Sequence, residues 1–169
     1  ISSEVPGVEF STGSLGHALP VGLGIALAGK INKENRKTVV LLSDGELNEG
    51  SNWEALLMAS HLALTNLYVI IDYNKIQALD SIQNILPLDN LYAKFKAFNW
   101  SVKEVLDGHD FEQIIASFKT NHNKQKPLAV ILHTVKGKGV KAFENSADWH
   151  ARKVKGNDID IGKQALGLI

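Results

Sequence analysis

A doubly wound α/β fold, with a mostly parallel sheet and helices on both faces, is the fold class that the sequence predicts. Apolar, β-branched segments of strand length alternate with segments of helical length along most of the chain. Residues 38–42 and 67–71 are apolar on both faces, which is typical of central parallel strands. Polar and glycine-containing turns separate these segments, so we expect strand–helix–strand units with right-handed crossovers.

The first half of the chain supplies two predicted helices around these strands. Residues 14–31 are small, apolar and glycine-containing, and they predict a tightly packed helix with Pro20 in its first turns. After the first strand, Ser51 and Glu54 form a capping-box pattern. This pattern predicts a helix that runs to about Leu64.

The second half continues the alternation. After a loop rich in turn formers, Asp89 is expected to cap a short helix that ends near Phe98. From Lys136 onward a glycine-rich, basic sequence predicts a loop-dominated tail, in which residues 153–169 match no pattern. The other predicted segments are an edge strand at 100–105, a helix at 111–120 and a fourth strand at 128–132.

The composition limits the class of protein. The 169 residues suit a single core, so the whole chain is interpreted as one domain. The formal net charge is zero, which gives no reason to expect binding to nucleic acid or membranes and weakly favours an oligomer. The lack of cysteine excludes disulfides and thiolate metal sites. With no signal-peptide or membrane-span pattern, we expect a cytoplasmic protein.

Oxygen ligands follow two of the predicted strands. Asp44 and Gly45 follow the first strand, and Asn74 follows the second after one strand–helix–strand unit. Ligands bind at such carboxyl ends in parallel sheets. A carboxylate, an amide oxygen and a backbone carbonyl suit Mg²⁺, and Gly45 allows a phosphate to approach closely. By itself, an Asp-Gly pair after a strand is more often a plain turn.

The run from Ser43-Asp44-Gly45 to Asn74 resembles the thiamine diphosphate signature, a Gly-Asp-Gly triplet followed by asparagine. Further motifs in the same order resemble the N-terminal, diphosphate-binding part of transketolases, especially those made of two separate subunits. These motifs are Thr12-Gly13-Ser14-Leu15-Gly16-His17, Trp53-Glu54-Ala55, Val135-Lys136-Gly137-Lys138-Gly139-Val140 and Trp149-His150. The resemblance extends from Pro6 to about Arg152, and it implies the thiamine diphosphate-binding fold.

The resemblance also implies roles for individual residues. The side chains of Asp44 and Asn74 and the backbone carbonyl of Ile76 would bind Mg²⁺. His150 and Glu49 would be the catalytic residues: His150 would contact the diphosphate and the reacting centre, and Glu49 would link two active sites across a dimer interface. The remaining implied cofactor-binding residues are Gly13 and Leu15 at the rings, Gly45 at the diphosphate, and Glu46.

The activity implied is transfer of a two-carbon ketol unit from a ketose, such as a ketose phosphate, to an aldose, with thiamine diphosphate and Mg²⁺ as cofactors. In this family the glutamate that activates the cofactor lies on a pyrimidine-binding domain. The expected partner is therefore a C-terminal transketolase subunit, in a homodimer, heterodimer or heterotetramer. The family's upstream histidines would precede Ile1, so we expect N-terminal sequence to be missing. Ser43 departs from the family triplet, as Ala18 and Pro20 depart from the usual glycine and serine.

Several alternatives stay open. A related enzyme, such as 1-deoxyxylulose-5-phosphate synthase or a 2-oxoacid dehydrogenase subunit, would share the cofactor, and a non-catalytic remnant would lack turnover. A Rossmann dinucleotide domain is disfavoured because no Gly-x-Gly-x-x-Gly turn joins a strand to a helix. The sugar is not identified. Residues 136–139 are interpreted as a mobile active-site loop, with a plain surface loop as the alternative. His61 is expected to pack inside the protein, and His109 is expected to be structural.

Overall fold

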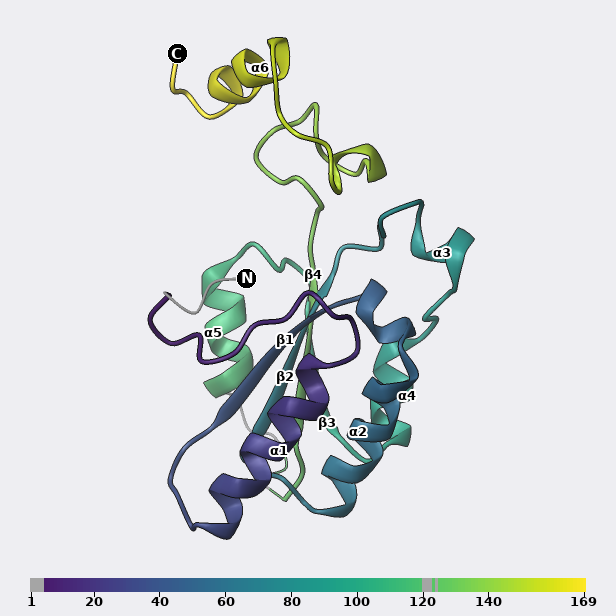
Figure 1. Cartoon of the computed structure of the whole chain (residues 1–169), viewed down its shortest axis with the longest axis vertical. Helices are drawn as coiled ribbons and strands as arrows, with labels where there is room; N and C mark the ends of the chain where they lie inside the picture. The colour runs from purple at the N-terminus through teal and green to yellow at the C-terminus, as the bar shows by residue number, and fades with distance from the viewer. Residues whose placement is uncertain (1–4, 120–122, 124) are drawn as a thin grey trace.

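Four parallel strands form the sheet of this chain. The computed structural model describes residues 5–119, 123 and 125–169. In the described chain the strand order is β1-β2-β4-β3, and every neighbouring pair is parallel (Figure 1). The strands are β1 (Thr38–Ser43), β2 (Leu67–Tyr73), β3 (Ser101–Val105) and β4 (Leu128–His133). The predicted parallel α/β fold is confirmed, and each strand begins within one residue of its predicted start.

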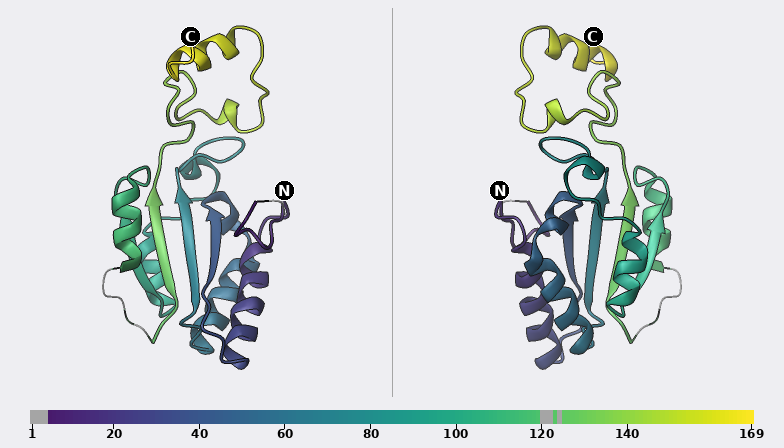
Figure 2. Two further views of the ribbon diagram at one scale, coloured as in Figure 1. Left: turned by 90° about the vertical axis from the view of Figure 1, so that its left-hand side faces the viewer. Right: turned by 90° about the vertical axis from the view of Figure 1, so that its right-hand side faces the viewer.

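Helices lie on both faces of the sheet, as Figure 2 shows. The helices α1 (Ala18–Ile31), α2 (Gly50–His61) and α4 (Leu91–Ala97) cover one face, and α5 (Phe111–Lys119) covers the other. The chain passes from β2 to the far strand β3 and then turns back to β4. Because parallel crossovers are right-handed, this change of direction brings α5 to the opposite face.

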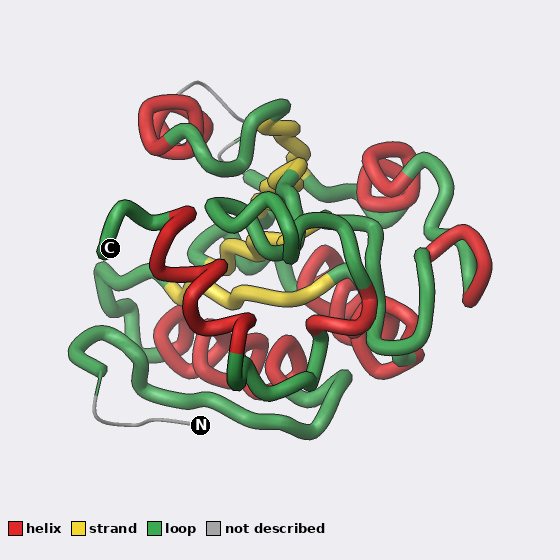
Figure 3. Tube along the Cα trace, turned by 90° about the horizontal axis from the view of Figure 1, so that it is seen from above, coloured by secondary structure: helices red, strands yellow, loops and turns green. Residues whose placement is uncertain are grey.

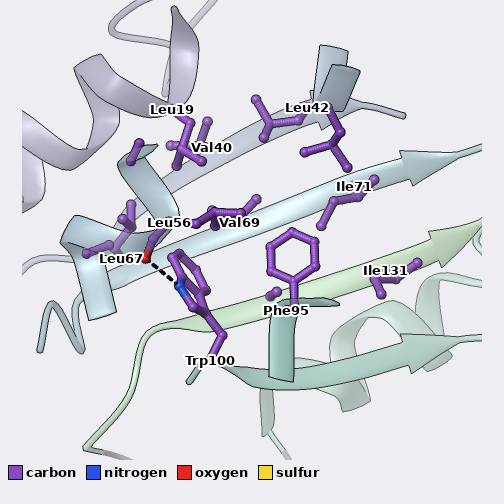
Figure 4. Close-up of a cluster of buried hydrophobic side chains, with 14 of the residues drawn as sticks. Leu19, Val40, Leu42, Leu56, Leu67, Val69, Ile71, Phe95, Trp100 and Ile131 are labelled. Atoms are coloured by element: carbon purple, nitrogen blue, oxygen red, sulfur yellow. Dashed lines mark hydrogen bonds between the residues drawn. The ribbon is translucent and has the colours of Figure 1, made fainter. Parts of the chain in front are cut away.

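The main core lies between the sheet and the helices α1, α2 and α4 (Figure 4). Leu19, Leu56 and Phe95 are fully buried there against apolar side chains of the strands. Trp100 is 1% exposed, and its indole N–H donates to the carbonyl of Leu56 at 3.0 Å. A smaller core joins β2, β3 and β4 to α5, and includes Tyr68 and Val130. The two cores support the sheet on both faces, and Asp44 and Asn74 follow β1 and β2 at its carboxyl edge.

Helix starts differ from the sequence prediction at two places. Ser51 does not cap α2; Glu49 precedes the helix, and the hydroxyl of Ser51 donates to the carbonyl of Gly16 at 2.6 Å. Asp89 does not cap α4; Asn90 does, and its side chain accepts from Ala93 N–H at 3.0 Å. At the start of α2, the contact of Ser51 with Gly16 takes the place of the capping hydrogen bond. At the start of α4, the neighbouring residue Asn90 makes the capping hydrogen bond in place of Asp89.

The prediction of a loop-dominated tail missed a helix. The helix α6 (Asn157–Ala165) has no buried residue, so no apolar pattern marked it. The short helix α3 (Ile82–Ile85) was also missed within the turn-rich loop. Figure 3, seen from above, shows the C-terminal segment lying over the carboxyl ends of the strands. The predicted end of the α5 helix at residue 120 lies outside the described residues.

Two histidine predictions have different outcomes. His61 is exposed at the end of α2, so the prediction that it packs inside is wrong. His109 has the structural contact that was expected, because its Nε2 accepts from Val135 N–H at 2.8 Å. Among the described residues, no helix has the length and apolar character needed to cross a membrane.

Candidate functional site

The ends of β1 and β2 bring the predicted metal ligands to one edge of the sheet. Ser43 pairs with Asp72 in the parallel register, and Asp44 N–H extends the ladder by donating to the carbonyl of Asp72 at 3.1 Å. Asn74 follows β2 two residues beyond that pair. The two strand ends therefore place Asp44 and Asn74 close together, as the spacing predicted.

The carboxylate of Asp44 is buried and is held by backbone groups. The residue is 2% exposed. Its two oxygens accept hydrogen bonds from Gly45 N–H at 2.7 Å and from Lys75 N–H at 2.5 Å. Burial raises the pKa of Asp44, and the nearby negative charge of Asp72 adds to this; the two backbone hydrogen bonds and the charge of Lys136 act in the opposite direction. Nothing in the described chain forms an ion pair with this carboxylate.

Asn74 lies at the same edge with its two amide ends differently bound. Its Oδ1 accepts from Ile76 N–H at 3.0 Å, and its Nδ2 donates to the carboxylate of Asp72 at 3.4 Å. Between these residues, Lys75 has a φ of +68°, which turns the chain sharply so that its N–H reaches Asp44. Asp44, Asn74 and Ile76 thus belong to one hydrogen-bonded turn system.

A loop before α1 is fastened to the turn after β1. Gly16 N–H donates to Oε1 of Glu46 at 3.0 Å, and the carbonyl of Gly16 accepts the Ser51 hydroxyl at 2.6 Å. Gly16 has a φ of +80°, and a Cβ on it would lie 2.5 Å from the Ser51 hydroxyl oxygen. Glycine is therefore required at this close approach. The joint fixes the loop that carries Gly13 and Leu15, both exposed, beside the Asp44 turn.

Glu46 and Glu49 have different environments. Glu46 is 8% exposed in the 3₁₀ turn η1 (Gly45–Asn48), and burial raises its pKa while the hydrogen bond from Gly16 lowers it. Glu49 is exposed at the start of α2. Gly45 is covered by the side chain of Gln77, which would lie 3.3 Å from a Cβ at that position.

His150 lies in the segment after β4 and has other partners than Asp44 and Asn74. It follows the 3₁₀ turn η2 (Ala147–Trp149), and its Nδ1 lies 3.1 Å from Nζ of Lys136. Trp149 stacks between Phe143, at 3.9 Å between ring centroids, and the Arg152 guanidinium, at 4.4 Å. In the part of the chain that the structure describes, the ring of His150 is bonded to Lys136 and not to the Asp44 turn. The positive charge of Lys136 acts to lower the pKa of Asp44.

These residues fit a magnesium ion bound together with a diphosphate. A buried carboxylate without an ion pair is costly, and a divalent cation offsets that cost. Mg²⁺ takes few protein ligands and completes its shell with water and phosphate oxygens. In the described ranges no group of three or more His, Cys, Asp or Glu residues could hold a metal. The expected set is of another kind, with one carboxylate, one amide oxygen and one carbonyl.

Two features of the site were not predicted from the sequence. Asp72 and Thr134 are hydrogen-bonded to each other across β2 and β4, next to Asn74. The Gly16–Glu46 joint was also missed as a contact. The only local signal for Asp72 was a carboxylate inside an otherwise apolar strand, and nothing local marked Thr134.

The comparisons with known proteins concern the chain as a whole. Residues 2–169 match the family described as "Transketolase, thiamine diphosphate binding domain". The chain is 40% identical over 166 residues to one subunit of the apulose-4-phosphate transketolase of Actinobacillus succinogenes, covering 98% of this chain and 60% of that protein. It is 43% identical over 148 residues to the protein of the same name in Phocaeicola vulgatus, covering 87% and 52%. The chain thus spans little more than half of these relatives.

A solved structure extends the similarity to three dimensions. The crystal structure of transketolase from Campylobacter jejuni superposes with a TM-score of 0.86 at 28% sequence identity. The match covers 95% of this chain and 26% of that one. The fold described above therefore corresponds to only a part of the longer chain of that enzyme.

Proposed function

This chain belongs to the transketolase thiamine diphosphate-binding domain family, and on this premise we propose that it anchors thiamine diphosphate through Mg²⁺ in an enzyme that transfers two-carbon ketol units. The donor is a ketose, such as a ketose phosphate, and the acceptor is an aldose. One observation carries the proposal. The buried carboxylate of Asp44 lies beside Asn74 at the sheet's carboxyl edge, bonded to backbone N–H groups and to no cationic side chain in the described chain.

The metal ligands proposed in this chain are Asp44, Asn74 and the carbonyl of Ile76. Asp44 contributes the negative charge, and the two uncharged oxygens contribute hard ligands suited to Mg²⁺. The hydrogen bonds in the turn hold these groups near one another before any ligand binds. Preorganisation of this kind lowers the entropy cost of binding. Gly45 follows Asp44 directly and is the proposed point of contact with the diphosphate.

The remaining residues of the site position the cofactor and substrate. When bound, thiamine diphosphate supplies the carbanion stabilisation that cleavage of a ketose carbon–carbon bond requires. Gly13 and Leu15 hold the rings from a loop that Gly16 fastens to Glu46. His150, whose Nδ1 accepts from Nζ of Lys136, presents its Nε2–H group to the diphosphate and to the reacting centre.

A second polypeptide completes the proposed site. Leu15 is 54% exposed and Glu49 is also exposed, which supports a second surface closing over both. The two relatives compared above are each named as one subunit of an enzyme, and a name of that kind indicates a further subunit. The proposed partner carries a pyrimidine-binding domain whose glutamate activates the cofactor, and Glu49 links the two sites. Residues 1–169 then form one domain of a dimeric or tetrameric assembly.

The proposed donor to test first is apulose 4-phosphate, because two relatives are named for it. The other proposed donors are ordinary ketose phosphates. A phosphorylated sugar also accords with a cytoplasmic location, which forms part of the proposal.

A reconstitution experiment tests the function. The protein that contains this chain is combined with the candidate pyrimidine-domain subunit, thiamine diphosphate and Mg²⁺. An aldose acceptor is added with each donor, and formation of the lengthened ketose from that acceptor is followed, with pyruvate decarboxylation as the competing reaction. Ketol transfer that requires both subunits supports the proposal. Pyruvate decarboxylation without ketol transfer would assign the chain to another branch of thiamine diphosphate enzymes, and cofactor binding without turnover would indicate a non-catalytic remnant.

A further inference from the structure

Asp72 is a carboxylate at the site that the proposed metal set does not use. It stands on β2, between the register partners Ser43 on β1 and Leu132 on β4. Its Oδ1 accepts a hydrogen bond from the hydroxyl of Thr134, which follows β4. Its Oδ2 accepts from Nδ2 of Asn74 at 3.4 Å. Both oxygens therefore bind side chains from the carboxyl ends of two different strands.

The contact with Asp72 determines which end of the Asn74 amide faces away from Asp72. An ionised carboxylate only accepts hydrogen bonds, so it binds the NH₂ end of the amide. The carbonyl oxygen of the amide then points to the other side, where it accepts from Ile76 N–H at 3.0 Å. This is the atom that a magnesium ion requires, since an amide NH₂ group cannot bind a cation.

Thr134 fixes Asp72 and joins it to the loop that carries Lys136. Thr134 N–H donates to the carbonyl of Tyr73 at 3.4 Å, and Gly108 N–H donates to the carbonyl of His133 at 2.7 Å. The next residue, Val135, donates to Nε2 of His109 at 2.8 Å. The exit of β4 is therefore tied to the ends of β2 and β3, and the Asp72 side chain lies at the first of these ties.

We infer that Asp72 and Thr134 are positioning residues for the metal site: Thr134 orients Asp72, and Asp72 holds the Asn74 amide with its oxygen toward the cation. Neither residue touches the metal or the substrate. The inference rests on the magnesium site of the proposed function. It extends that site to two residues that act on it through hydrogen bonds.

Three substitutions test the inference in the whole protein assembled with its partner. Asp72→Ala removes both carboxylate oxygens, so Nδ2 of Asn74 and the Thr134 hydroxyl both lose their acceptor. Thr134→Val keeps the shape and removes the hydroxyl, whereas Thr134→Ser keeps the hydroxyl. Asp160→Asn, on the exposed face of α6, is the matched control for loss of one carboxylate.

The measurements are Mn²⁺ affinity by electron paramagnetic resonance with thiamine diphosphate present, and the melting temperature without metal or cofactor. Loss of a group that orients a metal ligand typically weakens metal binding about 10- to 100-fold. We expect a decrease of this size for Asp72→Ala and a smaller one for Thr134→Val, with wild-type affinity for Thr134→Ser and Asp160→Asn. The melting temperature of the two threonine variants should agree.

The outcomes separate this inference from the proposed function. Wild-type protein that binds no Mn²⁺ would overturn the metal site and this inference with it. Wild-type binding together with unchanged affinity in Asp72→Ala and Thr134→Val would overturn the positioning role alone. Tighter binding in Thr134→Val would show that Asp72 is itself a metal ligand released by loss of the hydroxyl, which also contradicts the inference.

Discussion

Replacing Gly16 by alanine perturbs the joint between the loop of Gly13 and Leu15 and the turn after β1. A Cβ at this position would lie 2.5 Å from the Ser51 hydroxyl oxygen and 2.7 Å from Cβ of Glu49. The φ of +80° also disfavours any residue with a side chain. A small shift does not relieve the two contacts, because they come from Glu49 and Ser51 at the start of α2. The loop must therefore move away from Glu46.

The size of the loss in cofactor affinity follows from the backbone conformation of Gly16 and from its hydrogen bond to Glu46. A left-handed conformation costs a non-glycine residue about 1–2 kcal/mol. Release of the loop instead loses the hydrogen bond from Gly16 N–H to Glu46, and such bonds to a charged group contribute about 1.5–3 kcal/mol. Because tenfold in affinity corresponds to about 1.4 kcal/mol, release should weaken binding of the cofactor about 10- to 100-fold. Gly16 precedes α1 and is not a member of either hydrophobic cluster, so the fold should persist.

Calorimetric titration of thiamine diphosphate in the presence of Mg²⁺ measures the effect. Gly24→Ala is the matched control, since a Cβ at this exposed position in α1 would meet nothing within 4 Å. Alanine there should leave affinity unchanged and stabilise the helix by up to about 1 kcal/mol. Wild-type affinity in Gly16→Ala would refute the reasoning, because it would show that docking of this loop does not contribute to the cofactor site.

Three further predictions concern the carboxylates. Asp44→Ala should abolish measurable Mg²⁺-dependent cofactor binding in calorimetry, because the metal loses its one carboxylate ligand; retained affinity would exclude the assigned metal site. Glu49→Gln should weaken assembly with the partner in analytical ultracentrifugation while leaving the melting temperature unchanged, and normal assembly would make Glu49 an ordinary surface residue. Glu46→Gln keeps an acceptor for Gly16 but cannot titrate. Since burial raises the folded-state pKa of Glu46, its protonation stabilises the fold at low pH, and this contribution is lost as pH rises through the raised pKa. The metal-free wild type should therefore gain more thermal stability than Glu46→Gln between neutral and mildly acidic pH, and identical pH profiles would contradict the burial argument.

The strands were predicted well because their signal is local. Residues 38–42, 67–71 and 128–132 are continuous apolar runs, and such runs specify strands that are covered on both sides. The prediction that residues 38–42 form a central strand is wrong: β1 lies at an edge of the described sheet, and its Val39 and Leu41 are 55% and 65% exposed. The sequence of a strand shows which of its own side chains are apolar, but it does not show whether a helix or another strand covers them.

The helix caps and the contact between Asp72 and Thr134 could not be predicted from local sequence patterns. Ser51 with Glu54 satisfies the capping-box pattern, yet its hydroxyl binds Gly16, which lies 35 positions away. Asp72 was visible only as a polar residue in an apolar strand, and its contact with Thr134 spans 62 positions. The helix α6 buries no residue and so leaves no apolar stripe. Each case depends on tertiary contacts, or on their absence, which spacing alone does not report.

The Asp44 and Asn74 pair was predictable because a parallel sheet brings successive strand ends to one edge. In the structure, Ser43 at the end of β1 pairs with Asp72 near the end of β2, which brings the two strand ends together. The contribution of Glu49 and the closing of the site over Leu15 stay predictions, since both concern a surface that this chain leaves open.

Anomalous diffraction from crystals grown with Mn²⁺ and thiamine diphosphate tests the central claim most directly. The account predicts one manganese peak at the carboxyl edge of β1 and β2, within coordination distance of the Asp44 carboxylate, Oδ1 of Asn74 and the carbonyl of Ile76. The remaining ligands should be diphosphate oxygens and water. A diphosphate bound at this edge with manganese elsewhere, or bound with no manganese, would contradict the account.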